Sequence, residues 1–189
     1  MEKKDYLHVL LLWMFLIVCV VIFLFPMKMY GSVTDFISQH SVFPDYFRKL
    51  FYETGNLFPS LAMNIGGGQN IYYFSYYGFL SPIVLLSYLF PFIPMIDYIM
   101  VSSFLSILIS VYLFYRLLKN HGFECSVCFW TTFMFACAAP LLFHSHRHIM
   151  FVNYMPFLLL GLIGIDLYFK HGKRWLYAFS VFLMIMTSY

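Results

Sequence analysis

One acidic side chain stands where it could do chemistry. Asp35 lies in the segment Gly31-Ser-Val-Thr-Asp-Phe-Ile-Ser-Gln39, directly after a long apolar run. A carboxylate roofed by apolar segments can have a raised pKa and act as a base, or it can hold a divalent metal. The structural alternative is a helix cap, in which Thr34 or Asp35 satisfies free backbone donors at the start of segment 36–40.

The second candidate is the densest polar cluster later in the chain, which comprises His144, His146, Arg147 and His148. A guanidinium in such a cluster can clamp a phosphate or pyrophosphate with two parallel hydrogen bonds, and an imidazole can assist. Three histidines at positions i, i+2 and i+4 can instead ligate a metal. A solvated loop between two apolar segments is the third interpretation.

The composition shows what must position these clusters. Hydrophobic residues make up 62% of the 189 residues and charged residues only 10%, whereas a soluble domain has roughly a quarter charged residues. The net charge of +3 is small, and its lysines and arginines are too scattered to follow a nucleic acid backbone. We therefore predict an all-α polytopic membrane protein, with no nucleic acid partner.

The apolar runs predict the spans. Residues 6–25 form a first run of about 20 residues, which is enough to cross a hydrocarbon core. Further spans are predicted at 99–118, 127–143 and 151–169, and a last one opens at 175 and is cut off at 189. Lys3 and Lys4 precede the first span, which places the N-terminus in the cytoplasm. Since no cleavage site follows it, the first run is expected to stay as an anchor.

Residues 27–79 hold too many polar groups for a lipid-exposed span, so they are predicted to form an outer loop. Within this loop, aromatic and leucine side chains recur at helical spacing over residues 43–51, with Asp45, Arg48 and Lys49 between them. This pattern predicts an amphipathic helix in the interface plane. The Gly66-Gly67-Gly68 triplet lacks the Lys and Ser/Thr of a phosphate loop and is expected to form a tight turn.

Charge favours one topology. Residues 80–94 are apolar but short and contain three prolines, so they form either a re-entrant segment or a short span. If they do not cross, seven of the 11 basic residues lie on the cytoplasmic side, close to span ends. Both polar segments, 27–79 and 144–153, then share the outer face and can build one site.

The remaining polar residues have ordinary explanations. Asp97 and Asp166 stand at span ends, where we expect a cap or, for Asp166, a salt bridge to Lys170. The four cysteines are Cys19, Cys125, Cys128 and Cys137. They are expected to be small buried hydrophobes, with zinc or redox chemistry at the Cys125–Cys128 pair as the alternative.

The order of these elements resembles the C-type glycosyltransferases and, within them, the YfhO family of bacterial membrane proteins. The resemblance rests on motifs in the outer loop, on the Ser-Pro that follows them and on the later polar segment. These are Thr34-Asp-Phe-Ile-Ser-Gln39, Asn56-Leu-Phe-Pro-Ser60, Asn64-Ile-Gly-Gly-Gly68, Phe74-Ser-Tyr-Tyr77, Leu80-Ser-Pro82, His146-Arg-His-Ile149 and Asn153-Tyr-Met-Pro156. Because family members are several times longer, this chain is expected to be the N-terminal part, residues 1–189, of one transmembrane glycosyltransferase-like domain, inactive alone.

The resemblance implies a bacterial plasma-membrane enzyme that moves a sugar from a polyprenyl-phosphate lipid to an extracytoplasmic cell-envelope polymer such as a teichoic acid. It makes Asp35 the catalytic base or a metal-organising group, with no cofactor certain and a divalent metal as an alternative. Substrate binding is assigned to the polar residues of the two outer segments: Gln39, Asn64, His144, His146, Arg147 and His148. The alternative function is a lipid or polymer transporter or accessory flippase, whose outer loop only recognises the substrate.

Overall fold

Three apolar stretches of the chain fold into helices long enough to cross a bilayer. The computed structural model describes residues 2–27 and 31–188, and within them the candidate spans are Lys3–Ile22 of α1 (Lys3–Met27), α4 (Met95–Asn120), and Ile149–His171. The last of these joins α7 (Ile149–Asn153) to α8 (Met155–His171), and a shorter apolar helix, α9 (Trp175–Ser188), follows. Residues 28–30 of the predicted outer loop and residue 189 of the predicted last span lie outside the described residues.

The segment predicted as a span at 127–143 is interrupted. It consists of α5 (Cys125–Ala136) and α6 (Ala139–Ser145), whose axes differ by 47°. Pro140 lies in the first turn of α6. A proline has no backbone N–H and its ring clashes with the carbonyl four residues earlier, so it kinks or breaks a helix at this position. The two parts count together as a fourth candidate span.

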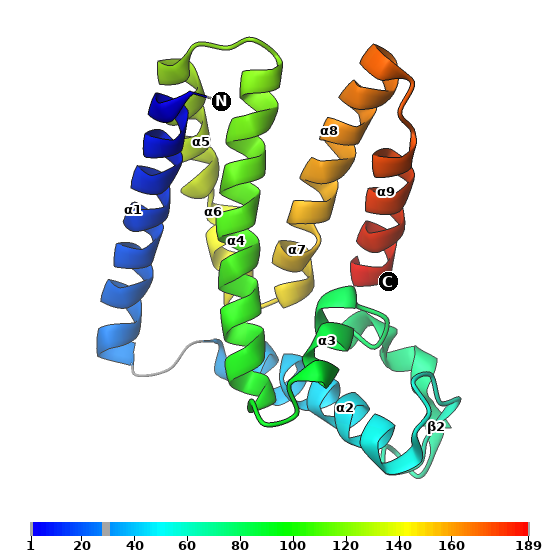
Figure 1. The fold of residues 1–189 in the computed structure, drawn as a ribbon. Helices are drawn as coiled ribbons and strands as arrows, with labels where there is room; N and C mark the ends of the chain where they lie inside the picture. Colours follow the sequence, from blue (N-terminus) through cyan, green and yellow to red (C-terminus); the bar gives the residue numbers. More distant parts are fainter. Residues whose placement is uncertain (1, 28–30, 189) are drawn as a thin grey trace.

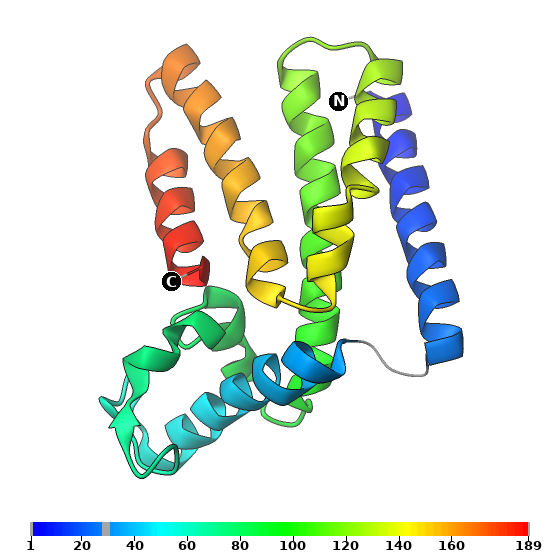
Figure 2. The same cartoon turned by 180° about the vertical axis from the view of Figure 1, so that it is seen from behind.

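The first helix is held by one stripe of side chains. Val9, Leu12 and Leu16 are buried against Ile107 and Val111 of α4. Most other large side chains of α1 are exposed, as expected for a helix that is apolar all round and faces lipid on its remaining sides. α1 therefore belongs to the bundle edge, next to α4 and α5 (Figures 1 and 2).

Small residues bring the other helices close together. Ser106 of α4 is buried and its hydroxyl donates to the side-chain oxygen of Asn153 in α7 over 3.2 Å. A methyl group on Gly164 of α8 would lie 2.6 Å from the backbone nitrogen of Tyr177 in α9. Such close approach of backbones is typical of helix packing in membranes, where no hydrophobic effect drives association.

A small subdomain lies at one end of the bundle (Figure 1). Its helical elements are η1 (Val33–His40), α2 (Val42–Thr54), η2 (Ile71–Tyr77), α3 (Pro82–Leu86) and η3 (Ser87–Leu89), and β1 (Leu61–Ala62) pairs antiparallel with β2 (Gln69–Asn70). The α2 helix covers the amphipathic segment 43–51 and buries Phe47 in a cluster that includes Ile71 and Phe79.

The glycine triplet and the short apolar segment 80–94 have simple conformations. The three glycines 66–68 all have positive φ and form the β1–β2 turn, closed by a hydrogen bond from the backbone nitrogen of Gly68 to the carbonyl of Ile65. Residues 80–94 hold only α3 and η3, of five and three residues, and neither is long enough to cross a membrane.

Successive long helices run in opposite directions, so the connections between them lie alternately at the two ends of the bundle. The site end, as we call it, carries the subdomain and the connection 146–148 between α6 and α7 (Figures 1 and 2). The far end carries the N-terminal start of α1 and the connections 121–124 and 172–174. The seven basic residues counted above all belong to the far end; they are Lys3, Lys4, Arg116, Lys119, Lys170, Lys173 and Arg174. Both predicted polar segments accordingly share the site end.

The far end holds a buried polar cluster that we did not predict. Asp5 is fully buried and accepts hydrogen bonds from the hydroxyl of Tyr115 over 3.0 Å and the thiol of Cys125 over 3.3 Å. The ammonium of Lys119 lies 3.6 Å from the same carboxylate oxygen. The cluster ties the start of α1 to α4 and α5.

Two expectations about ordinary residues are wrong. The carboxylate of Asp166 pairs with His121 over 3.1 Å, and the ammonium of Lys170 donates to the carbonyl of Asn120. Both side chains therefore contact the end of α4 and the residue after it, instead of each other. All four cysteines are free thiols, but only Cys128 is buried; Cys19 and Cys137 are exposed on the apolar helices and Cys125 is half-buried.

Candidate functional site

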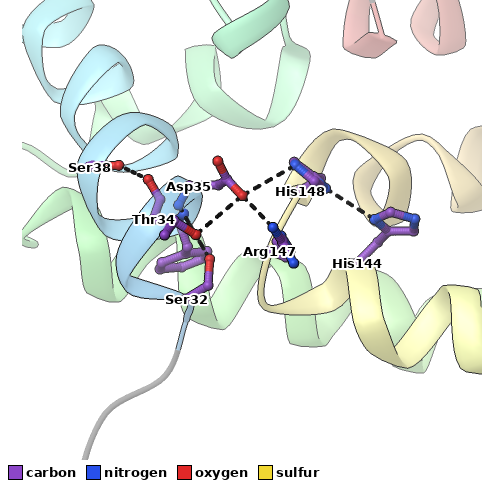
Figure 3. Close-up of polar contacts among 8 residues, drawn as sticks. Ser32, Thr34, Asp35, Ser38, His144, Arg147 and His148 are labelled. Atoms are coloured by element: carbon purple, nitrogen blue, oxygen red, sulfur yellow. Dashed lines mark hydrogen bonds and ion pairs between the residues drawn. The ribbon is translucent and has the colours of Figure 1, made fainter.

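The two predicted clusters meet at the site end. Nε of Arg147 lies 2.9 Å from Oδ2 of Asp35, and Nε2 of His148 lies 3.6 Å from the same oxygen (Figure 3). Asp35 comes from η1 and the two bases come from the connection between α6 and α7, so residues more than a hundred positions apart form one ion-pair cluster. The guanidinium and the imidazole both approach this oxygen from the α6–α7 connection (Figure 3).

The cap at the start of η1 explains why this carboxylate is available. The hydroxyl of Ser32 accepts hydrogen bonds from the backbone nitrogens of Asp35 and Phe36, each over 3.4 Å. Ser32, rather than Thr34 or Asp35, therefore satisfies the free donors, and the capping alternative for Asp35 is wrong. The Thr34 hydroxyl instead donates to Asp35 over 3.4 Å.

Two contacts hold η1 against the second cluster. The backbone nitrogen of Ser32 donates to the carbonyl of His146 over 2.9 Å. Phe36 is fully buried among Met95, Ile99 and Ile149, which belong to α4 and α7. Packing and backbone hydrogen bonding therefore set the position of Asp35 relative to Arg147, independently of the ion pair.

The helix that carries Asp35 has an unusual pitch. η1 is a π-helix, with hydrogen bonds from the nitrogen of Ile37 to the carbonyl of Ser32 and from Ser41 to Phe36. His40, five residues after Asp35, shares one neighbour with it, His148. Short π-helical turns are rare and are frequent at functional sites.

Sequence reasoning missed His40. Its side chain is only 1% exposed, its ring lies edge-on to that of His148 with centroids 5.8 Å apart, and it packs against Tyr77. Burial, helped by the nearby His148, lowers the pKa of His40 to about 4, so the ring is neutral at neutral pH. The position of His40 five residues after Asp35 is a signal only if a π-helix is expected, and nothing in the sequence predicts one.

Electrostatics keep the central carboxylate ionised. The hydrogen bond from Arg147, followed by the charges of Arg147 and His148, holds the pKa of Asp35 below its ordinary value. This is the opposite of the raised pKa that a buried base would have. Asp35 is a negative charge at neutral pH, and it becomes a stronger base only when Arg147 leaves it.

Arg147 has a second contact, with an aromatic ring at the end of α6. Its guanidinium carbon lies 5.2 Å from the centre of the Phe143 ring, within the range of a cation–π interaction. Its side chain is 40% exposed, so the guanidinium can still receive an anion from the aqueous side.

The other predicted binding residues are placed as follows. Nδ1 of His144 lies 3.3 Å from Nδ1 of His148, so His144 extends the cluster by one ring (Figure 3). His146 turns back to the carbonyl of Leu142, at 3.1 Å. Gln39 is half-buried on η1. Asn64 lies exposed in the β1–β2 turn, at the end of the subdomain away from the bundle (Figure 1), and is not brought to the cluster.

The described residues form no ready-made metal site. Within the described part of the chain, no group of three or more His, Cys, Asp or Glu side chains could hold a metal ion. His144, His146 and His148 do not converge, since His146 faces the carbonyl of Leu142 in the preceding helix α6. The guanidinium of Arg147 already lies against Asp35 on the side where a cation would bind.

The fold and this site define the class of protein: an all-α membrane protein with several apolar helices and a polar site at one end of the bundle. Residues 8–189 match the family model described as bacterial membrane protein YfhO, which covers nearly the whole chain, so the chain belongs to the YfhO family. No curated protein and no solved structure matches the chain.

Proposed function

We propose that this protein is a membrane glycosyltransferase. It moves a sugar from a polyprenyl-phosphate donor to a cell-envelope polymer, such as a teichoic acid, outside the cytoplasm. The observation that carries the proposal is the ion-pair cluster of Asp35, Arg147 and His148 at the end of apolar spans. It combines a carboxylate, for an acceptor hydroxyl, with a guanidinium, for a lipid phosphate, at headgroup depth.

The orientation of the bundle supports an outer location for this site. Seven of the 11 basic residues lie at the far end, within or next to the terminal turns of the spans. Lys and Arg near span ends are enriched on the cytoplasmic side. The proposed topology therefore has the N-terminus in the cytoplasm and the site end outside, in the plasma membrane.

In the proposed reaction, the acceptor hydroxyl attacks the anomeric carbon while the bond from that carbon to the phosphate oxygen breaks. The hydroxyl proton passes to Asp35, and the lipid phosphate leaves with its negative charge bound by Arg147. The phosphate competes with Asp35 for the guanidinium, since both accept its N–H groups. Binding of the donor thereby removes the contact that lowers the pKa of Asp35 and makes the carboxylate a better base.

His148 has a supporting role in this scheme. Its Nε2 faces Asp35 and its Nδ1 faces His144, so it can hold the carboxylate in place when Arg147 turns to the phosphate. No step requires a metal.

One observation favours the alternative of a lipid or polymer transporter or accessory flippase. The α5–α6 pair is broken by 47°, and interrupted helices line the binding sites of many secondary transporters. Those sites also carry charged groups near the bilayer midplane, whereas the charged residues of the candidate spans lie close to their ends.

A transfer assay separates the two functions. Membranes that contain the protein as its gene encodes it are supplied with defined polyprenyl-phosphate sugars and an acceptor polymer, and polymer-bound sugar is measured. An enzyme gives transfer that requires the protein. Donor lipid that changes leaflet without any sugar appearing on the polymer would refute the transferase proposal.

A further inference from the structure

A groove lies between α8 and α9 at the far end of the bundle, beside the connection 172–174 (Figure 1). Its volume is about 590 Å³, which is within the usual range of about 300–1,000 Å³ for ligand sites. The lining is aliphatic and aromatic, with a single charged residue, and comprises Ile165, Tyr168, Phe169, Arg174, Tyr177 and Ala178.

The lining comes from one face of each helix. Residues 165, 168 and 169 follow the i, i+3, i+4 spacing of a helix face, and residues 174, 177 and 178 repeat it at the start of α9. Ala178 contributes only a methyl group, which leaves space between the surrounding rings. Ile165 stands six residues before the end of α8 at His171, which corresponds to about 9 Å along the helix axis. The groove therefore runs from the far-end surface into the apolar part of the bundle.

Arg174 puts a permanent positive charge at the surface end of the groove. An arginine stays protonated at any physiological pH. Its side chain is exposed and, like that of the exposed Lys173 beside it, forms no salt bridge within the described part of the chain. The carboxylate of Asp166 on α8 is already paired with His121 over 3.1 Å. The charge of Arg174 is thus available to an anion.

Free backbone donors lie at the same end of the groove. α9 begins at Trp175, and its first internal hydrogen bond runs from the nitrogen of Ala178 to the carbonyl of Arg174. The N–H groups of residues 175–177 therefore have no acceptor within the helix, and such groups stabilise an anion. Two carbonyls near the end of α8, those of residues 167 and 168, are engaged by the backbone nitrogens of residues 173 and 172.

We propose that this groove binds a phospholipid with an anionic phosphodiester headgroup, of which phosphatidylglycerol is the simplest representative. Its phosphate lies on Arg174, and the first carbons of an acyl chain lie between α8 and α9. The rest of the lipid belongs to the bilayer. The Asp35 cluster lies at the opposite end of the bundle, so this site does not rest on the function proposed above.

The surroundings of the groove favour a lipid over a protein partner. Trp175 and Phe169 are 75% and 81% exposed, and aromatic side chains are enriched where spans meet the headgroups. Lysine, the residue type at position 173 next to the groove, is depleted in protein–protein interfaces. Basic residues between spans are, by contrast, the usual contacts of anionic lipid headgroups.

The test is photo-crosslinking of the protein as its gene encodes it, reconstituted in phosphatidylcholine vesicles. Two lipid probes carry the same diazirine near the start of an acyl chain and differ only in their headgroup, which is phosphatidylglycerol or phosphatidylcholine. We expect the phosphatidylglycerol probe to label residues 165–169 and 174–178 at least about fivefold more strongly, the factor that corresponds to one basic residue near an anionic lipid. Excess unlabelled phosphatidylglycerol should remove these labels, whereas inorganic phosphate at the same concentration should not.

Two pairs of variants separate the charge from the space. Arg174→Gln should lower labelling by the phosphatidylglycerol probe about fivefold, whereas Lys173→Gln, which removes an equal charge outside the lining, should lower it by less than about twofold. Ala178→Trp fills the groove and should abolish labelling by both probes. Phe179 is 43% exposed on the same helix and does not line the groove, so Phe179→Trp should leave labelling unchanged. All variants are compared at equal amounts of membrane-inserted protein, and the peptide map of the unsubstituted protein stands independently of them.

Three results would overturn the inference. Equal labelling by the two probes would show an ordinary annular lipid. Absence of labels from residues 165–169 and 174–178 with either probe would show that protein, from the same chain or a second copy, covers the groove. Removal of the labels by inorganic phosphate would show a site for the ion alone.

Discussion

Replacement of Asp35 by Asn tests the centre of the proposed mechanism. Asn keeps the shape of the side chain but removes its charge and its basicity. The structure shows that little else should change: Ser32 caps η1, and Phe36 and the Ser32–His146 backbone hydrogen bond hold the helix in place. Since the pair is solvent-accessible, with side chains 23% and 40% exposed, its loss should hardly affect folding.

The expected loss of rate follows from the role of the group. A positioned general base contributes about 10²–10⁴-fold to a reaction, so Asp35→Asn should lower kcat for sugar transfer by at least about a hundredfold. The donor KM should change much less, and can fall, because Arg147 no longer has a carboxylate that competes with the phosphate. Both constants are measured with isolated membranes and a labelled polyprenyl-phosphate sugar.

Asp45 provides the matched control. It is a carboxylate of the same subdomain and also forms ion pairs, with Arg48 over 3.2 Å and with Lys49 over 2.7 Å, but it lies on α2, which supplies none of the cluster residues. Asp45→Asn should leave kcat within about twofold. Normal transfer by Asp35→Asn, or an equal loss in both variants, would refute the assignment of Asp35 as the base.

Three further predictions concern other parts of the molecule. Arg147→Lys should raise the donor KM about 10–100-fold in the same assay, because hydrogen bonds to charged groups are worth about 1.5–3 kcal/mol and an ammonium cannot reproduce the planar guanidinium. An unchanged KM would show that the connection 146–148 has no role in donor binding. His40 has a pKa lowered to about 4, so the folded state resists protonation that the unfolded state accepts near pH 6.5: the melting temperature in detergent should fall as the pH drops from 7.5 to 4.5. His40→Phe should flatten that dependence, and an equal pH dependence in the variant would contradict this. Single cysteines at Asn56 and Lys173, both exposed, should react with an impermeant maleimide before and only after permeabilisation, respectively; the reverse pattern would invert the proposed topology.

Much of the bundle follows from hydropathy and charge. The apolar runs predict the helices because each must bury its backbone hydrogen bonds within itself at membrane depth. The break at Pro140 was readable in principle, since a proline inside an apolar run predicts a kink. For Asp35 and Arg147, the sequence predicts only that both lie on the same side of the membrane. Even this depends on whether residues 80–94 cross the membrane.

The finer features of the site could not be predicted. Which side chain caps η1 depends on where the helix begins, and Ser32, Thr34 and Asp35 are all acceptable caps. The lowered pKa of Asp35 depends on a contact with Arg147, 112 positions later. That contact exists only after η1 has packed against the connection between α6 and α7. His40 comes into the cluster through a π-helical turn, a conformation without a sequence signature.

The buried cluster around Asp5 constrains the order in which the helices assemble after synthesis. Asp5 leaves the ribosome before its partners Tyr115 and Cys125, which follow 110 and 120 positions later. At a synthesis rate of about 5–20 residues per second, α1 waits about 5–25 seconds for them. Docking of α1 is therefore a late event that the arrival of α4 and α5 makes possible, and a bulky group attached beside Asp5 would obstruct assembly rather than insertion.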